Sequence, residues 1–103
     1  MASRSERMVE AMLEDAALSL DELCRAVAVE PRWVQERVEA GLLEAPAGEP
    51  TAWRFDALAF TRVRRMVRVE RDFDAGPELA ALVADLAEEI AALRRALRRG
   101  GAG

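Results

Sequence analysis

The side chains of this chain that could do chemistry are of few kinds. Nineteen aspartates and glutamates, fifteen arginines and the single Cys24 occur among 103 residues, with no histidine, lysine or tyrosine. Zinc sites need several cysteine or histidine ligands, and a nucleophilic thiol needs a neighbouring base. Neither arrangement can be assembled here, and no phosphate-binding loop or acid–base pair stands out. The sequence therefore predicts recognition by charge rather than catalysis, with no cofactor and no metal ion.

The charges are distributed unevenly along the chain. Residues 1–50 contain eleven carboxylates and five arginines, a net charge of −6, whereas residues 51–73 contain three carboxylates and six arginines, a net charge of +3. The whole chain has a net charge of −4. This asymmetry predicts either two faces with different partners or one face that meets the other across a dimer.

The elements that must position these charges begin with residues 18–43, which predict a helix-turn-helix. Ser19 and Glu22 have the spacing of a capping box at the start of the first helix. Pro31 suits the first turn of the second helix, and Gly41 suits its end. The apolar face of the first helix consists of Leu20, Leu23, Cys24 and Val27. Cys24 is therefore expected to be a small core residue, and Trp33 is expected to be partly buried.

A small β wing and a third helix are expected next. Residues 44–52 are rich in Pro, Gly and small residues and predict a loop. Trp53 and Phe55 alternate with Arg54, which indicates a short strand with one buried face, expected to pair with residues 42–43 as a hairpin. Residues 56–73 predict a helix capped by Asp56. Its apolar side is expected to hold Leu58, Ala59, Val63, Met66, Val67 and Val69, and its polar side Arg62, Arg64, Arg65, Arg68 and Arg71.

Residues 77–99 predict a fourth helix with coiled-coil periodicity. Its two seam positions are filled by Leu79, Leu86 and Leu93 and by Val83, Ile90 and Leu97. So regular a seam is hard to bury within a small chain, which favours a homodimer over packing within one monomer. Glu89 and Arg94 have the spacing of a cross-pair in a parallel dimer, although one exposed pair contributes little. Residues 100–103, GGAG, are expected to form a flexible tail after two units, 1–73 and 77–99.

Several strings in this order resemble a known family. They are LSLDELCRAVAVEPRWVQERVEAGLLEAPAG from residue 18, WRFD at residues 53–56 and RVRRMVRVERDF at residues 62–73. The order of elements resembles the MerR-type winged helix, and the strings look closer still to the chaperone-modulator family CbpM, over about residues 18–99. The chain departs from the family pattern at FDAGPELAALVADL, residues 73–86, where Pro77 and a missing Asn change the start of the last helix.

The resemblance implies a mainly α protein, a MerR-like winged helix-turn-helix with a small β wing and a C-terminal dimerisation helix. It also favours a short strand within residues 8–13, where periodicity alone does not decide between helix and strand. The implied protein is bacterial, cytoplasmic and non-enzymatic. It would bind the J-domain of a DnaJ-type co-chaperone such as CbpA and restrain its stimulation of DnaK. Because J-domains present a basic helix beside an acidic-tipped loop, the expected contacts are Trp33, Glu36, Glu39, Arg65 and Arg68.

The alternative is a dimeric DNA-binding regulator of the MerR or HspR type, whose second helix would enter the major groove. The outward charges expected on that helix are Glu30, Arg32, Glu36, Arg37 and Glu39. Three carboxylates against two arginines suit a polyanion poorly and suit a basic protein surface better. The simpler interpretation of any one of these charges is a solvated residue, and of the third-helix arginines an ion pair. MerR-type relatives imply an antiparallel dimer, whereas the seam residues favour a parallel one.

Overall fold

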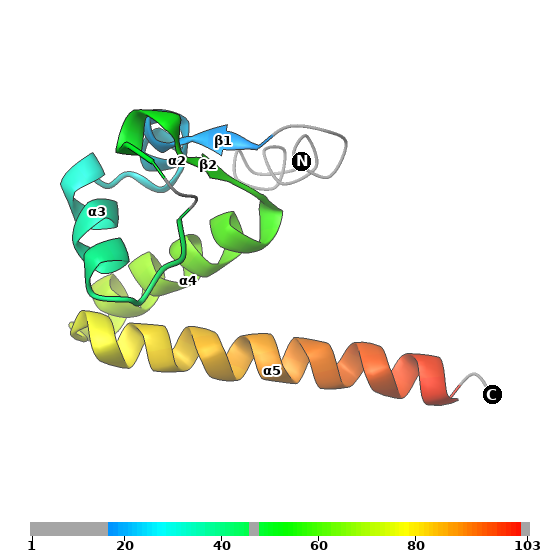
Figure 1. Ribbon diagram of the computed structural model, residues 1–103. Coiled ribbons are helices and arrows are strands. Elements are labelled where there is room, and N and C mark those ends of the chain that lie inside the picture. Colours follow the sequence, from blue (N-terminus) through cyan, green and yellow to red (C-terminus); the bar gives the residue numbers. More distant parts are fainter. Residues whose placement is uncertain (1–16, 46–47, 102–103) are drawn as a thin grey trace, which may run out of the picture.

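The computed structural model describes residues 17–45 and 48–101 as four α-helices with a small two-stranded sheet (Figure 1). The elements are β1 (Leu18–Ser19), α2 (Leu20–Val27), α3 (Pro31–Glu39), the 3-10 turn η1 (Pro50–Ala52), β2 (Arg54–Phe55), α4 (Ala57–Phe73) and α5 (Pro77–Gly101). The mainly α fold class is confirmed. The strand expected within residues 8–13 lies outside the described residues.

The helix-turn-helix forms where the sequence predicts it. The Ser19 hydroxyl accepts a hydrogen bond from the Glu22 amide at 3.2 Å, and the Glu22 carboxylate accepts one from the Ser19 amide at 2.9 Å. This capping box satisfies two amides that have no partner within the helix. Pro31 begins α3, and Gly41 follows its end at φ +77°, a conformation that few residues other than glycine adopt readily. The ends of the two helices are therefore set by residues at or next to those ends.

The sheet differs from the expected wing. β2 pairs antiparallel with β1, with Leu18 opposite Phe55 and Ser19 opposite Arg54, so the expected hairpin with residues 42–43 is wrong. Leu43 instead buries its side chain in the core, and the Leu42 carbonyl accepts hydrogen bonds from the Arg62 side chain. The backbone after α3 is thus engaged by a side chain, and β2 pairs with the strand that precedes α2.

The core lies where α4 meets α2 and the sheet. Asp56 caps α4, because its carboxylate accepts a hydrogen bond from the Ala59 amide at 2.9 Å. The expected anchors Trp53 and Phe55 are both buried, with their rings edge to face and centroids 6.1 Å apart. From α4 the buried side chains are Phe60, Val63, Met66 and Val67. Leu58, expected on this apolar side, is 78% exposed, because it precedes Val63 by five residues and so projects about 140° away.

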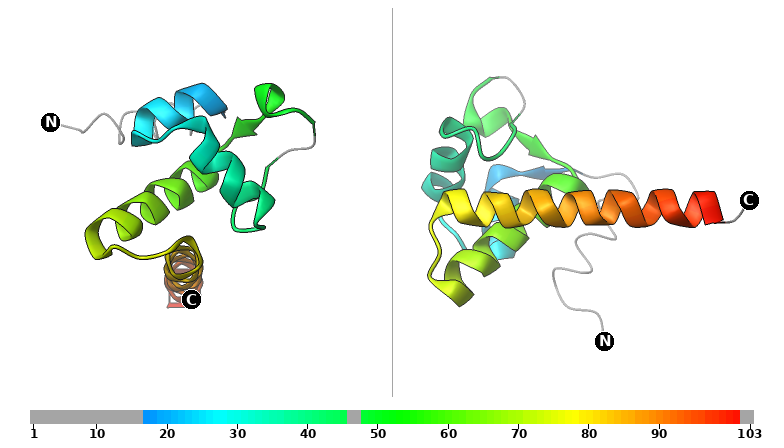
Figure 2. Two further views of the ribbon diagram at one scale, coloured as in Figure 1. Left: turned by 90° about the vertical axis from the view of Figure 1, so that its left-hand side faces the viewer. Right: turned by 90° about the horizontal axis from the view of Figure 1, so that it is seen from below.

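The last helix, α5, has two apolar faces, and only one of them is covered. Its buried residues are Ala80, Ala81 and Ala84, and α5 makes its main contact with α4. Small side chains of this kind let two helices approach closely. The C-terminal part of α5 projects beyond the rest of the molecule (Figures 1 and 2). The helix also includes Gly100 and Gly101. Residues 102–103 lie outside the described range.

The opposite side of α5 carries large apolar side chains that nothing covers. Their exposed fractions range from 49% to 73%, and they are Leu79, Leu82, Leu86, Ile90, Leu93 and Leu97. We call these six residues the α5 stripe. It contains five of the six expected seam residues, and the sixth, Val83, is half-buried. None of the helices in the described ranges has the length and apolar character needed to cross a membrane.

Candidate partner-binding site

The outward face of α3 is acidic. Arg32, Glu36 and Glu39 are spaced by four and three residues, which places them on one side of the helix, and all three are exposed. Arg32 Nε lies 3.7 Å from Glu36 Oε2. Exposed pairs of this kind contribute at most about 1 kcal/mol and do not hold their charges rigidly. The face therefore presents more negative than positive charge to solvent.

Arg37 does not belong to that face, contrary to the expectation from the sequence. Its Nη2 and Nε donate to the two carboxylate oxygens of Glu70 on α4, at 2.7 and 3.1 Å. Its Nη1 donates to the Trp33 carbonyl at 3.1 Å, and its guanidinium lies 3.9 Å from the centre of the Trp33 ring. The side chains of Arg37 and Glu70 are only 12% and 15% exposed. This pair joins α3 to α4 and largely buries the Arg37 guanidinium, although its Nη1 also lies 3.9 Å from Glu36 Oε1 at the edge of the acidic face.

Trp33 is half-buried, as expected, with the Arg37 guanidinium over its ring. This stacking and the two-point pair to Glu70 act together, since the planar guanidinium can serve both at once. Trp33 therefore contributes to the α3–α4 contact and keeps part of its surface available next to the acidic face.

The two arginines expected to complete the site lie on another side of the molecule. Arg65 is half-buried and Arg68 is exposed, and neither forms an ion pair within the described residues. Arg65 precedes Glu70 by five residues, so it projects about 140° away from the side of α4 that meets Arg37. The structure thus groups Trp33, Glu36 and Glu39 on α3 and leaves Arg65 and Arg68 apart from them.

Arg68 lies instead among other arginines of α4. With Arg64 and Arg71 it lines a shallow hollow of about 290 Å³ between α2 and α4. Arg71 donates to the carbonyl of Ala28 at the end of α2, and the Arg64 guanidinium lies 5.8 Å from the centre of the Phe60 ring. Part of the α4 arginine set therefore holds α2 in place.

Arg62 has the densest set of contacts on α4. Its Nε and Nη2 donate to the Leu42 carbonyl at 3.1 and 3.0 Å, and its Nη1 donates to Asp85 at 2.8 Å and Glu88 at 2.9 Å. Burial acts to lower the pKa of Arg62, but the hydrogen bonds that Arg62 donates to Glu88 and Asp85, together with the charges of these carboxylates, outweigh it, so the pKa is raised. Sequence analysis placed Arg62 only on the polar side. Arg62 lies beside Val63 and one turn before Met66, at the margin of the apolar face. This position was the available sign in the sequence that Arg62 would be partly buried and engaged in contacts.

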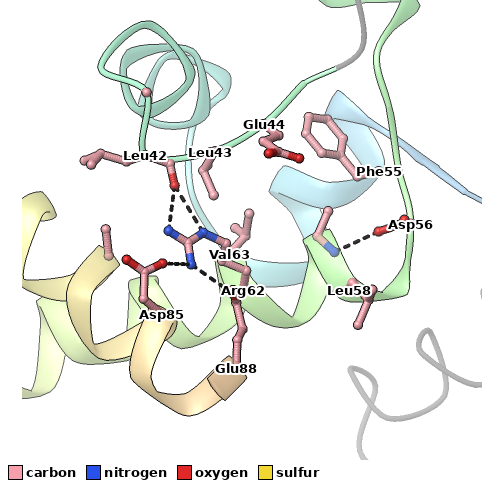
Figure 3. Close-up of a pocket in the computed structure, with 13 residues that line it drawn as sticks. Leu42, Leu43, Glu44, Phe55, Asp56, Leu58, Arg62, Val63, Asp85 and Glu88 are labelled. Carbon is pink, nitrogen blue, oxygen red and sulfur yellow. Dashed lines mark hydrogen bonds and ion pairs between the residues drawn. The ribbon is translucent and has the colours of Figure 1, made fainter. Parts of the chain in front are cut away.

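A larger hollow lies beside Arg62 (Figure 3). It measures about 520 Å³ and is bounded by the segment after α3, by β2, by the first two turns of α4 and by residues 81–88 of α5. Phe55, Val63 and Ala81 supply buried apolar surface. Its carboxylates come from Glu44, Asp56, Asp85 and Glu88. The hollow thus combines an apolar floor with an acidic margin.

Cys24 is a buried thiol in the core, as expected. Burial raises the pKa of Cys24 to about 11, and the nearby charge of Asp21 acts in the same direction. A thiol in this state is protonated at neutral pH and is a poor nucleophile. Over residues 17–45 and 48–101, no cluster of potential metal ligands is found.

Comparison with known proteins agrees with the helix-turn-helix arrangement of α2 and α3. The family model described as MerR HTH family regulatory protein matches residues 18–99. A protein named chaperone modulatory protein CbpM from Pseudomonas entomophila (strain L48) is 34% identical over 77 residues, covering 75% of this chain and 76% of the relative. The protein of the same name from Coxiella burnetii (strain Dugway 5J108-111) is 32% identical over 81 residues, covering 79% and 76%. This chain belongs to the CbpM family.

Membership of the CbpM family confirms the resemblance drawn from the strings at residues 18, 53 and 62, and the MerR-type model agrees with the helix-turn-helix. The names of these relatives describe modulatory or regulatory proteins. No solved structure matches the chain.

Proposed function

We propose that this chain is a chaperone modulator that binds the J-domain of a DnaJ- or CbpA-type co-chaperone and thereby limits its stimulation of DnaK. Two facts support the proposal: the relatives are named chaperone modulatory proteins, and the outward face of α3 is acidic. By occupying the J-domain surface, the protein would deny that surface to DnaK.

The observation that carries the proposal is the position of Arg37. With Arg37 paired to Glu70, the outward face of α3 consists of Glu36, Glu39 and the single Arg32. A helix that enters a DNA groove needs positive charge, because phosphate neutralisation supplies much of the affinity. Carboxylates in this position suit a basic helix of a protein partner, where complementary charge steers association.

In this proposal, Arg65 and Arg68 make a second contact with the J-domain. They could donate paired hydrogen bonds to a carboxylate on the acidic-tipped loop of a J-domain, as arginines commonly do. Because they lie on a different side of α4 from the α3 face, the partner would have to wrap around the domain to reach both sets. The α3 contact can therefore be tested separately from the α4 contact.

The test is the double substitution Glu36→Arg and Glu39→Arg, with binding to a purified J-domain protein of the same organism followed by titration calorimetry. We expect affinity to fall at least tenfold, about 1.4 kcal/mol. Glu49→Arg, at an exposed carboxylate before η1, is the control for charge change and should bind as the unmodified chain does. Unchanged affinity in the double variant would remove the α3 face from the proposal.

We also propose that the protein is a homodimer joined through Leu79, Val83, Leu86, Ile90, Leu93 and Leu97. The α5 stripe is an exposed apolar surface of the kind that marks an interface. Along α5 every carboxylate, from Glu78 to Glu89, precedes every arginine, from Arg94 to Arg99. An antiparallel pair sets the acidic half of one helix beside the basic half of the other, whereas a parallel pair sets like charges together. We therefore favour the antiparallel arrangement.

A second candidate function is DNA binding, which the description of the matching MerR family model favours. It predicts a gel shift with promoter DNA that weakens steeply as salt rises, because each phosphate contact releases counterions. A shift that is absent at low salt, together with J-domain binding, would exclude it in favour of the proposal above.

A further inference from the structure

The hollow of Figure 3 offers hydrogen-bond acceptors but almost no donors. Its charged lining consists of four carboxylates, from Glu44, Asp56, Asp85 and Glu88, and one guanidinium, from Arg62. These groups sum to a net charge of −3. Any ligand that replaces water there must supply positive charge and N–H groups.

Arg62 cannot meet an anionic ligand, because its donors are already committed. Four of its five N–H groups are used by the Leu42 carbonyl and the carboxylates of Asp85 and Glu88. The carboxylates, in contrast, have spare capacity. Asp85 and Glu88 each use one oxygen for Arg62, Asp56 uses one for the Ala59 amide, and Glu44 has no partner among the described residues. Each carboxylate can accept about four hydrogen bonds in all.

The hollow also has an exposed apolar side chain at its margin. Leu58, in the first turn of α4, lines the hollow and is 78% exposed. Phe55 and Leu43 lie beneath the surface of the same hollow and are almost fully buried. A ligand that covers Leu58 would therefore gain apolar contact as well as hydrogen bonds.

We propose that this hollow is the docking site for a cationic amphipathic segment of a partner protein. One large apolar side chain of that segment packs on the exposed Leu58, and flanking lysines or arginines donate to Glu44, Asp56, Asp85 and Glu88. This inference adds a docking site to the proposed function. It depends on the proposed function only for the identity of the partner, which is a J-domain protein. Glu39, on the acidic face of α3, is two residues before Gly41 of the hollow, so one basic helix could follow both.

A second copy of this chain is the less suitable occupant. The α5 stripe that would join two copies lies on the side of α5 opposite Ala80, Ala81 and Ala84. Ala81, Asp85 and Glu88, the α5 residues of the hollow, belong to the side that faces α4. Pairing through the stripe would leave the hollow open.

The first experiment uses a synthetic probe and not the co-chaperone. An end-capped helical peptide of leucine and lysine, with one apolar face, is titrated into the ¹⁵N-labelled full-length chain and followed by NMR. We expect saturable shifts at Leu43, Phe55, Leu58 and Ala59, and none with the matching leucine–glutamate peptide. Shifts confined to other residues, or equal shifts with both peptides, would overturn the proposal.

Variants then separate the hollow from general charge attraction. Glu44→Arg should weaken peptide binding at least tenfold, and Leu58→Ser should weaken it several-fold. Glu49→Arg lies in the same inter-helix segment outside the hollow and changes the charge equally, so it should stay within twofold. All three residues are exposed, so folding is retained. Equal losses for Glu44→Arg and Glu49→Arg would overturn the proposal in favour of non-specific attraction.

The same variants are finally titrated with the J-domain protein. If the peptide binds the hollow and the J-domain protein does not bind the chain at all, the proposed function fails while the cationic docking site stands. If the J-domain protein binds with unchanged affinity to Glu44→Arg and Leu58→Ser, the proposed function stands and the hollow is not its docking site. Shifts at the hollow that appear on raising the chain concentration alone would identify a second copy as occupant and overturn the proposal.

Discussion

Replacing Arg62 by methionine should destabilise the protein more than any other single arginine substitution on α4. Arg62 holds the segment after α3 through the Leu42 carbonyl and holds α5 through Asp85 and Glu88. Methionine preserves much of the aliphatic stem but offers no N–H groups. The change therefore removes the hydrogen bonds while disturbing the packing little.

The size of the effect follows from the exposure of each partner. The Arg62 side chain is 18% exposed, so its bonds to the Leu42 carbonyl are partly shielded, and we assign them about 1.5 kcal/mol. Asp85 and Glu88 are 58% and 49% exposed, so solvent screens their pairs and we assign these about 0.5 kcal/mol together. The sum is about 2 kcal/mol, or a fall in Tm of about 10 °C for a domain of this size.

The assay is thermal and urea unfolding at one fixed protein concentration, because association would make the Tm concentration-dependent. Arg65→Met is the matched control, since Arg65 has no hydrogen bond or ion pair among the described residues, and it should change stability by less than about 0.5 kcal/mol. Arg62→Lys should fall between the two, because one ammonium cannot reach the carbonyl and both carboxylates in the same geometry. Equal losses in Arg62→Met and Arg65→Met would refute this account of how α5 is held.

Four further predictions concern other parts of the molecule. Ile90→Glu should convert the dimer to a monomer in sedimentation experiments, whereas Leu58→Glu, at a leucine outside the α5 stripe, should not. Native Cys24 should resist a thiol reagent at pH 8 and react once the chain is unfolded. Because its folded pKa of about 11 exceeds the ordinary 9.0, the unfolded thiol ionises first, so stability should fall as pH rises between these values, and Cys24→Ala should abolish that fall. Ser19→Ala should lower stability by about 1 kcal/mol in urea unfolding, through loss of the helix cap. The hydrogen bond from the Ser19 amide lowers the pKa of Glu22. The stability that ionised Glu22 contributes is therefore present at neutral pH and is lost as the pH falls through that pKa. In an acid titration, Glu22→Gln should lose less stability than the unmodified chain.

The helices were predictable because their signals are local. The capping box at Ser19 and Glu22, the proline that begins α3, the cap at Asp56 and the heptads of α5 each depend on residues a few positions apart. Such patterns bias the backbone and the apolar face of a helix wherever the helix finally packs. The burial of Trp53 and Phe55 followed from their alternation with Arg54, and that of Cys24 followed from its helical spacing with Leu20, Leu23 and Val27.

The partner of β2 and the state of the arginines were not predictable in this way. A two-residue strand such as β2 carries no register information of its own, so its pairing with β1 depended on how Phe55 and Leu18 meet in the core. The seven-residue spacing that identified the α5 seam likewise did not indicate that its alanine face would be buried on α4 and its leucines exposed.

By itself the sequence determined four helices with their caps, one leucine-rich face and an excess of negative charge in the first half. Only the tertiary structure decided which charges remain available to a partner. Arg37 meets Glu70 across 33 residues of chain, and Arg62 meets Asp85 across 23, and each pairing converts a surface cation into a structural contact. The physical reason is that helical periodicity states which side a residue faces, whereas an ion pair also requires that another element approach that side, and packing of the whole core sets that approach.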